Sequence, residues 1–293
     1  MSAPRWEVEG RHWPHRAASR FVESGGLAWH VQTMGSGPCV VLLHGTGAAT
    51  HSWRGVMPLL AARFSVVAMD LPGHGFTRGR LRGGPTLPGI AGAVTALLKT
   101  LQIAPTVLVG HSAGAAIALR MVHDSGEQTP VVGLSPALMP FPGLAAKLFP
   151  ALAKALFVNP FAPRIFSRMA SAPGEAERFL QRATTSRIDA DGVRCYRALL
   201  STSQHCAGAL AMMANWDLEG LARLLPAIPS PVTLLHGEHD NAIPLDSVRK
   251  AAALLPAAQL ELLSGLGHLA HEERPDLAAA AITLAAAENA TAV

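Results

Sequence analysis

The segment GHSAG at residues 110–114 places a serine where it could act as a nucleophile. Ser112 lies between an apolar run that ends at Val109 and an Ala-rich segment with helical character. The pattern G-x-S-x-G is typical of a sharp strand-to-helix turn that projects the serine hydroxyl above a sheet. Gly110 and Gly114 suit this turn because side chains there would collide where the strand and helix pass closely. We therefore predict that Ser112 is a nucleophile presented at a helix N-terminus.

A serine hydroxyl becomes reactive only when a base removes its proton, and a carboxylate usually orients that base. Asp240 follows the apolar run of VTLLHGEHDNAIP, and His268 follows that of LELLSGLGHLAHEERP in a Gly-flanked turn. The order Ser112, Asp240, His268 is the one expected after a G-x-S-x-G turn. Glu238 and His271 are the alternatives. We favour His268 because His271 is expected to lie within the next helical turn.

Attack on a carbonyl also requires two donors for the oxyanion that forms. The amide of Ala113, directly after the nucleophile, is the first expected donor. The segment HGTG at residues 44–47 can supply the second from Thr46. His44 in the same segment is then expected to be structural, bonding to loop backbone.

The same segment permits a competing interpretation as part of a dinucleotide site. Gly45, Gly47 and Asp70 match part of the pattern G-x-G-x-x-G followed by an acid at the end of the next strand. Thr50 stands where the third glycine belongs, so the match is weak. We expect DLPGHG, which begins at Asp70, to form a turn at the rim of a pocket instead.

The elements that must position these residues are short apolar runs alternating with helical segments. Runs without polar alternation are typical of strands buried on both faces, as in a largely parallel sheet. Alternating strands and helices predict an α/β fold with a mostly parallel, doubly wound sheet. The predicted strands are 39–43, 65–69, 106–109, 130–134, 232–235 and 259–263, and the predicted helices include 52–63, 87–101, 113–124 and 245–255.

The alternation stops between the strands near residues 134 and 232. We predict that residues 1–136 and 229–293 form the core and that 137–228 form an inserted helical cap over the carboxyl ends of the strands. The cap is rich in Phe and Met, which favours an apolar ligand, although most of these side chains are expected to fill the cap's own core. The candidate pocket residues are Gly45, Trp53, His111, Met139, Phe141, Met213 and Trp216.

Composition excludes several classes of protein. Of 293 residues, 49% are hydrophobic and 15% are charged, so a large core and a folded chain are expected. The net charge of +4 is spread along the chain, so nucleic-acid binding is not predicted. Three cysteines cannot all pair, which favours a reducing compartment, and the N-terminal residues lack the apolar core of a signal peptide. We predict a cytoplasmic protein without a membrane-spanning segment.

Two further segments carry residues that could bind a membrane surface or a metal ion. The stretch Leu144–Val158 carries Lys147 and Lys154 seven residues apart on one helical face, which would suit weak association with a membrane surface. A cap helix with its lysines in solvent is the simpler interpretation. His12 and His15 lack further ligands, so no metal is predicted. The proposed chemistry requires no cofactor.

Taken together, HGTG, DLPGHG, GHSAG, GEHD and GLGHLAHEE resemble the motifs of the α/β-hydrolase superfamily over nearly the whole chain. At finer detail, WPHRAASRFVESGGLAWHVQ, ALAMMANWDL and GLGHLAHEERP resemble the α/β hydrolases of bacteriochlorophyll gene clusters, described as magnesium-chelatase accessory proteins. This resemblance implies a role near magnesium insertion into protoporphyrin and contact with the chelatase. It implies no particular reaction.

Two functions therefore remain open. The first is a serine hydrolase that cleaves an ester or similar acyl bond of an apolar substrate, and the resemblance points to a tetrapyrrole ester as that substrate. The second is a non-catalytic protein that holds a porphyrin or assists the chelatase. An aspartyl nucleophile, as in haloalkane dehalogenases and epoxide hydrolases, is disfavoured because residue 112 is serine.

Overall fold

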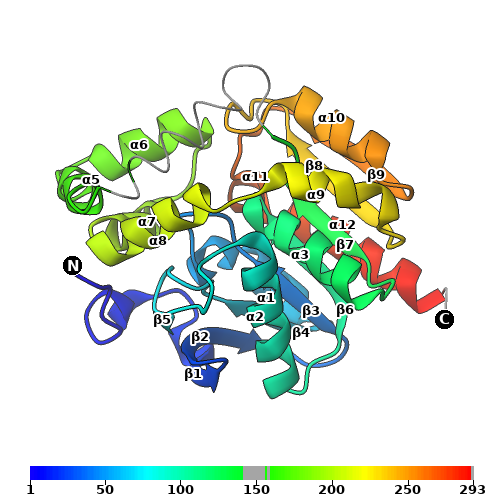
Figure 1. Cartoon of the computed structure of the whole chain (residues 1–293), viewed down its shortest axis with the longest axis horizontal. Helices are drawn as coiled ribbons and strands as arrows, with labels where there is room; N and C mark the ends of the chain where they lie inside the picture. Colours follow the sequence, from blue (N-terminus) through cyan, green and yellow to red (C-terminus); the bar gives the residue numbers. More distant parts are fainter. Residues whose placement is uncertain (141–155, 157–158, 292–293) are drawn as a thin grey trace.

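The computed structural model describes residues 1–140, 156 and 159–291. Its centre is a nine-stranded sheet in the order β1-β2-β4-β3-β6-β7-β8-β9, with β5 paired to β2 (Figure 1). All pairs from β4 to β9 are parallel, whereas the pairs that involve β2 are antiparallel. The strands are β1 Ser19–Ser24, β2 Leu27–Met34, β3 Cys39–Leu43, β4 Ser65–Met69, β5 Arg78–Gly79, β6 Pro105–His111, β7 Val131–Leu134, β8 Val232–Gly237 and β9 Ala258–Leu263.

Helices cover both faces of this sheet, as the alternating pattern predicts. In β3, Val40 and Leu42 belong to the core cluster that includes α1 and α12, whereas Val41 and Leu43 belong to the cluster on the other face, which includes α2, α3, α9 and α10. The central strands are therefore apolar on both faces, which explains their lack of polar alternation. These helices are α1 Val56–Ala61, α2 Leu87–Thr100, α3 Ala113–Ser125, α9 Leu218–Leu224, α10 Leu245–Leu254, α11 Ala270–Glu273 and α12 Pro275–Thr291.

Between β7 and β8, four of the described helices form a group beside the sheet rather than on its faces (Figure 1). Helix α8 among them contacts the loops that follow β3 and β4. His205 in α8 donates from Nε2 to the carbonyl of Gly47 at 3.0 Å, and its Nδ1 accepts from the amide of Gly75 at 3.1 Å. The four helices are α5 Ala162–Ala170, α6 Glu175–Thr184, α7 Ala190–Leu200 and α8 Ser203–Ala214. They thus lie at the carboxyl ends of the strands.

A buried polar cluster joins these helices to the sheet domain. Glu272 of α11 is fully buried and accepts a hydrogen bond from the Tyr196 hydroxyl of α7 at 2.7 Å. It also pairs with Arg54, whose guanidinium reaches Asp189 at the start of α7 at 2.9 Å. Burial raises the pKa of Glu272 despite the opposing effects of Arg54, Tyr196 and Ser52.

Two features of the N-terminal half differ from the expectations. The hairpin of β1 and β2 was not predicted, although Gly25 and Gly26 supply the positive φ values of its turn. The helix expected over residues 52–63 is divided into a short 3-10 helix, Thr50–Trp53, and α1, with Gly55 between them. Gly55 packs against Pro275, so a side chain there would collide. The other 3-10 segments are Glu9–His12, Arg16–Ala18 and Leu225–Ala227.

Candidate active site

Ser112 alone forms the junction between β6 and α3. Its backbone adopts φ 51° and ψ −116°, a conformation that costs a non-glycine residue about 1–3 kcal/mol. The surrounding structure holds this junction in place. The Ser112 amide donates to the carbonyl of Leu134 in β7 at 2.9 Å, and its carbonyl accepts from the amide of Ala137 at 3.2 Å. A strained serine is therefore fixed at the carboxyl edge of the sheet.

The two glycines of the turn are required by close backbone contacts. A Cβ atom at Gly110 would lie 2.2 Å from the amide nitrogen of Ala115, and one at Gly114 would lie 2.1 Å from the carbonyl oxygen of Leu43. Both distances are far below van der Waals contact. These distances confirm the prediction that side chains at Gly110 and Gly114 would collide where the strand and helix pass closely.

Asp240 and His268 come together from two different loops. Asp240 follows β8 and His268 follows β9, and His268 Nδ1 donates to Asp240 Oδ2 at 2.8 Å. The other carboxylate oxygen accepts the amides of Ala242 and Ile243 at 2.8 and 3.0 Å. Burial alone would raise the pKa of Asp240, but the hydrogen bond and charge of His268 and the Ile243 amide outweigh it and lower that pKa. Asp240 is therefore held as a carboxylate.

The two alternatives named from the sequence lie elsewhere. The Glu238 carboxylate is exposed and accepts from the Ser264 hydroxyl at 2.8 Å. His271 lies in α11, as expected, where its Nε2 shares a hydrogen bond with Ser52 at 2.8 Å. The carboxylate that meets His268 is thus Asp240.

The loop of His268 is attached to the residue beside the nucleophile. His111 Nε2 donates to the backbone carbonyl of His268 at 3.0 Å, and the two rings lie 4.7 Å apart between centroids. Among the described residues, no hydrogen bond joins Ser112 Oγ to the His268 ring. Such hydrogen bonds are often long without substrate and tighten when it binds. His268 is therefore in the neighbourhood of Ser112 but is bonded to Asp240.

The expected oxyanion donors flank Ser112. Ala113 is the first residue of α3, so its amide has no acceptor within the helix. On the other side, a Cβ atom at Gly45 would lie 3.1 Å from Ser112 Cβ, so the loop that carries Thr46 runs close to the nucleophile. His44 anchors this loop, because its Nδ1 donates to the Gly45 carbonyl at 2.7 Å. The interpretation of His44 as structural is confirmed.

The candidate pocket residues have different surroundings. Met139 and Trp216 are half-buried and pack against the core, whereas Met213 is 37% exposed. Trp53 is fully buried among core residues and packs on His271, with ring centroids 4.8 Å apart. Gly45 and His111 are buried beside Ser112. Phe141 and the stretch Leu144–Val158 lie outside the described residues, apart from residue 156.

One residue of α8 beside the site was not among the candidates. The sulfur of Met212 in α8 accepts from the Thr46 hydroxyl at 3.5 Å, and the Met212 side chain is fully buried. Its neighbour Met213 points outward. The sequence segment AMMA contains both methionines, and only the rotation of the helix distinguishes them.

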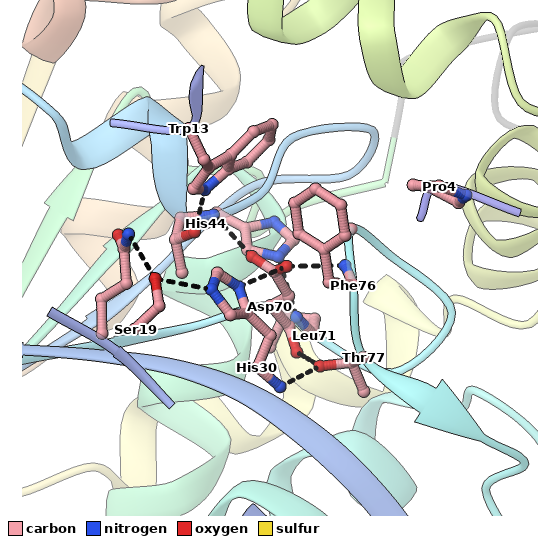
Figure 2. A network of polar contacts seen from close by, with 12 residues as sticks. Pro4, Trp13, Ser19, His30, His44, Asp70, Leu71, Phe76 and Thr77 are labelled. Atoms are coloured by element: carbon pink, nitrogen blue, oxygen red, sulfur yellow. Dashed lines mark hydrogen bonds and ion pairs between the residues drawn. The ribbon is translucent and has the colours of Figure 1, made fainter. Parts of the chain in front are cut away.

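Asp70 belongs to a buried network (Figure 2). Its carboxylate accepts from the amides of Thr50 and Phe76 at 2.7 and 2.8 Å and from His30 Nδ1 at 2.8 Å. His30 Nε2 in turn lies 3.0 Å from Ser19 Oγ. A buried carboxylate with these partners has no face free for a ribose, which argues against the dinucleotide interpretation. The network is also a second Ser-His-Asp set, and no sequence motif indicated it.

The described residues show no group that would hold a metal ion and no helix long and apolar enough to cross a membrane. His15 shares a hydrogen bond with the Arg54 carbonyl at 2.8 Å. All three cysteines are free, and Cys39 is half-buried in β3.

The mostly parallel sheet and the G-x-S-x-G turn between β6 and α3 are typical of α/β hydrolases. Sequence comparison assigns the chain to the same class. The profile of the Alpha/beta hydrolase family matches residues 40–281, so the chain belongs to that family. Over 267 residues it is 40% identical to the magnesium-chelatase 30 kDa subunit of Rhodobacter capsulatus, covering 90% of this chain and 93% of that protein.

Solved structures share the same architecture. The epoxide hydrolase CorEH superposes with a TM-score of 0.77 at 23% identity, over 90% of this chain and 96% of that one. An alpha/beta hydrolase fold protein from Burkholderia ambifaria superposes with a TM-score of 0.75 at 22% identity, over 90% and 97% of the two chains. At these identities the likeness shows the fold.

Proposed function

We propose that this protein is a serine hydrolase that cleaves an ester or similar acyl bond of an apolar substrate through Ser112, His268 and Asp240. The observation that carries the proposal is the 2.8 Å hydrogen bond between Asp240 and His268, in a loop that His111 attaches beside the strained serine. A buried carboxylate bonded to Nδ1 leaves the other ring nitrogen, Nε2, to act as a base.

The reaction would proceed in two halves. His268 removes the proton of Ser112 Oγ as this oxygen attacks the carbonyl carbon, and the amides of Ala113 and Thr46 stabilise the resulting oxyanion. The ester C–O bond then breaks, and His268 returns its proton to the leaving alkoxide. Water, deprotonated by His268, attacks the acyl-enzyme and releases the carboxylic acid and free Ser112.

We also propose that the chain divides into a core of residues 1–136 and 229–293 and a cap of residues 137–228. Contacts of α8 with the loops after β3 and β4 support this division. Met212, which contacts Thr46, is apolar, and the candidate pocket residues Met139 and Trp216 pack against the core. An apolar acyl group is the substrate that such a lining favours.

An ester series tests the hydrolase proposal. We expect the purified protein to hydrolyse p-nitrophenyl esters, with kcat/KM rising from acetyl to longer acyl chains, and the Ser112→Ala variant to lose this activity. Glu238→Gln is the matched control and should retain it, because Glu238 lies on the surface. Equal rates for wild type and Ser112→Ala would contradict the proposal.

A second function is favoured by one observation, the 40% identity to a relative named as a magnesium-chelatase subunit. On this alternative the protein acts in the cytoplasm in bacteriochlorophyll biosynthesis, holding a tetrapyrrole or assisting magnesium insertion into protoporphyrin without hydrolysis. Complementation of a deletion strain separates the two functions. Full pigment synthesis with Ser112→Ala would favour the non-catalytic role, and loss of pigment with this folded variant would favour hydrolysis.

A further inference from the structure

Helix α5 presents its large apolar residues to solvent and its small residues to the protein. Ala162, Pro163 and Ser167 are buried, whereas Phe161, Ile165 and Met169 are 61%, 56% and 59% exposed. A helix on a soluble protein normally has the opposite arrangement. Packing within the described structure therefore does not explain why α5 exposes its large apolar side chains.

The exposed apolar side chains form one ridge. Phe161, Ile165 and Met169 are spaced four residues apart, so they follow one another along one side of the helix. Phe166 extends the ridge, and Phe179 adds a fifth exposed apolar side chain from the adjacent α6. Figure 1 shows α5 at the outer edge of the molecule, away from the sheet. We call these five residues the α5–α6 ridge.

Arginines accompany the ridge. Arg164 and Arg168 lie three residues after Phe161 and Ile165, on the same side of α5, and both are exposed. Within the described residues neither has an ion-pair partner, whereas Arg178 of α6 pairs with Glu175. The ridge therefore carries uncompensated positive charge among its apolar side chains.

An open hollow of about 290 Å³ lies between the end of α5 and α7. Arg194 and Arg197 line it together with the hydroxyl-bearing Ser171 and Ser201. Arg194 pairs with Asp191, and Arg197 has no ion-pair partner among the described residues. The Ser171 hydroxyl already donates to the carbonyl of Ser167 at 2.7 Å. The hollow thus offers guanidinium donors next to the ridge, which suit a phosphate group.

We propose that the α5–α6 ridge docks this protein on the surface of an anionic phospholipid bilayer. The apolar side chains enter the boundary between headgroups and acyl chains, and Arg164 and Arg168 reach the phosphates. A convex ridge that alternates arginine with large apolar residues suits a fluid surface. A protein partner would need a matching groove lined with acids. The proposal concerns docking and does not depend on hydrolysis.

Vesicle co-sedimentation tests the proposal. We expect the protein to bind vesicles of phosphatidylcholine mixed with phosphatidylglycerol, less so phosphatidylcholine alone, and less again at high salt. Ile165→Glu/Met169→Glu should lower the bound fraction by about tenfold. Its matched control is Leu262→Glu/Leu284→Glu, which adds the same charge at exposed apolar positions away from the cap.

A second pair of variants tests the contribution of Arg164 and Arg168 to vesicle binding. Arg164→Glu/Arg168→Glu should abolish the preference for anionic vesicles, whereas Arg80→Glu/Arg82→Glu, an equal charge change at exposed residues elsewhere, should preserve it. All four variants should hydrolyse soluble esters like wild type, so failure of docking and failure of the hydrolase proposal are distinguishable. Equal binding by ridge and control variants would overturn the docking proposal.

A fluorophore on the ridge reports insertion directly. Burial raises the pKa of the native thiols to about 11 for Cys39 and Cys206 and about 12 for Cys195, so Met169→Cys can be labelled selectively near neutral pH. We expect a blue shift of an environment-sensitive dye at this position on anionic vesicles. No shift, or a shift produced only by an acidic protein partner, would overturn the proposal.

Discussion

The molecule contains two Ser-His-Asp sets with nearly the same hydrogen bond and different surroundings. In both, a histidine Nδ1 donates to an aspartate Oδ2 at 2.8 Å, His268 to Asp240 and His30 to Asp70. The second set even has its serine in contact, with Ser19 Oγ 3.0 Å from His30 Nε2. The hydrogen bonds that link a serine, a histidine and an aspartate therefore cannot by themselves identify a catalytic site.

The serines differ in how they are presented. Ser19 has extended backbone with φ −85° and ψ 140° and also accepts a hydrogen bond from Gln32 Nε2 at 3.1 Å. It begins β1 and has no helix N-terminus behind it. Ser112 has φ 51° and stands directly before α3. Donors for an oxyanion are therefore expected beside Ser112 and not beside Ser19.

The histidines differ as well. The Trp6 ring lies 4.8 Å from the His30 ring and the Phe76 ring 5.4 Å from it, so aromatic side chains enclose it. His30 is fully buried, whereas the His268 side chain, in the loop after β9, is 10% exposed. We interpret the set of Ser19, His30 and Asp70 as a structural clamp between β1, β2 and the loop after β4.

Covalent labelling should distinguish the two serines most strongly. A fluorophosphonate should modify Ser112 and leave Ser19 unmodified, as read by peptide mass spectrometry. We expect Ser112→Ala to abolish this labelling, because the variant lacks the oxygen that the fluorophosphonate modifies. Ser19→Ala should label like wild type. Modification of Ser19 would refute the structural interpretation of its set.

The two aspartates should respond in opposite ways. Asp240→Asn should lower kcat by about 10⁴-fold, because an amide cannot stabilise the imidazolium or fix its tautomer. Its melting temperature should stay near that of wild type, since the amide oxygen can still accept from Ala242 and Ile243. Kinetics and calorimetry on the same preparation provide the measurement. A large loss of stability with retained kcat would reverse the assignment.

Asp70→Ala should instead destabilise the fold. The change leaves His30 and the amides of Thr50 and Phe76 without their buried acceptor, and breaking such a buried group costs about 3–5 kcal/mol. Urea unfolding measures this loss. The matched control is Asp246→Ala, an exposed aspartate paired with Arg249, for which the loss should be below about 1 kcal/mol. Similar losses for both variants would contradict the role of Asp70 as a clamp.

Acid should weaken the fold through its buried histidines. Burial lowers the pKa of His44 to about 4 and of His74 and His205 to about 3. Their stability contribution is complete above the unfolded pKa of 6.5 and is lost as the pH falls toward 3–4, since only the unfolded chain binds these protons in that range.

Between pH 6.5 and the folded-state pKa of each ring, the free energy of unfolding should fall by about 1.4 kcal/mol per pH unit for each histidine. Urea unfolding at several pH values measures it. His74→Gln should reduce the slope by the share of one histidine, and Asp70, whose pKa is lowered, adds loss only at still lower pH. A stability that does not change between pH 7 and 5 would show that these rings are not held neutral.

Much of the sheet could be predicted because each central strand carries its own signal. The strands predicted over residues 39–43 and 65–69 match β3 and β4 to the residue, and the helix predicted to start at Ala113 does so. The β1–β2 hairpin escaped prediction because its strands are mixed in polarity and joined at Gly25 and Gly26. Its pairing depends on β4, which lies far along the chain.

The sequence by itself determined which features follow one another along the chain. These are an apolar strand, a G-x-S-x-G turn, a helix, and then an acid and a histidine after later strands. These signals are local, because backbone sterics and burial on both faces act on neighbouring residues. Only the tertiary structure decided that Asp240 rather than Glu238 meets His268, and that a second pair forms between His30 and Asp70. It also decided that Met212 faces Thr46 while α5 turns its large side chains outward. Hydrogen bonds and burial depend on placement to within about an ångström, and packing between distant segments sets that placement.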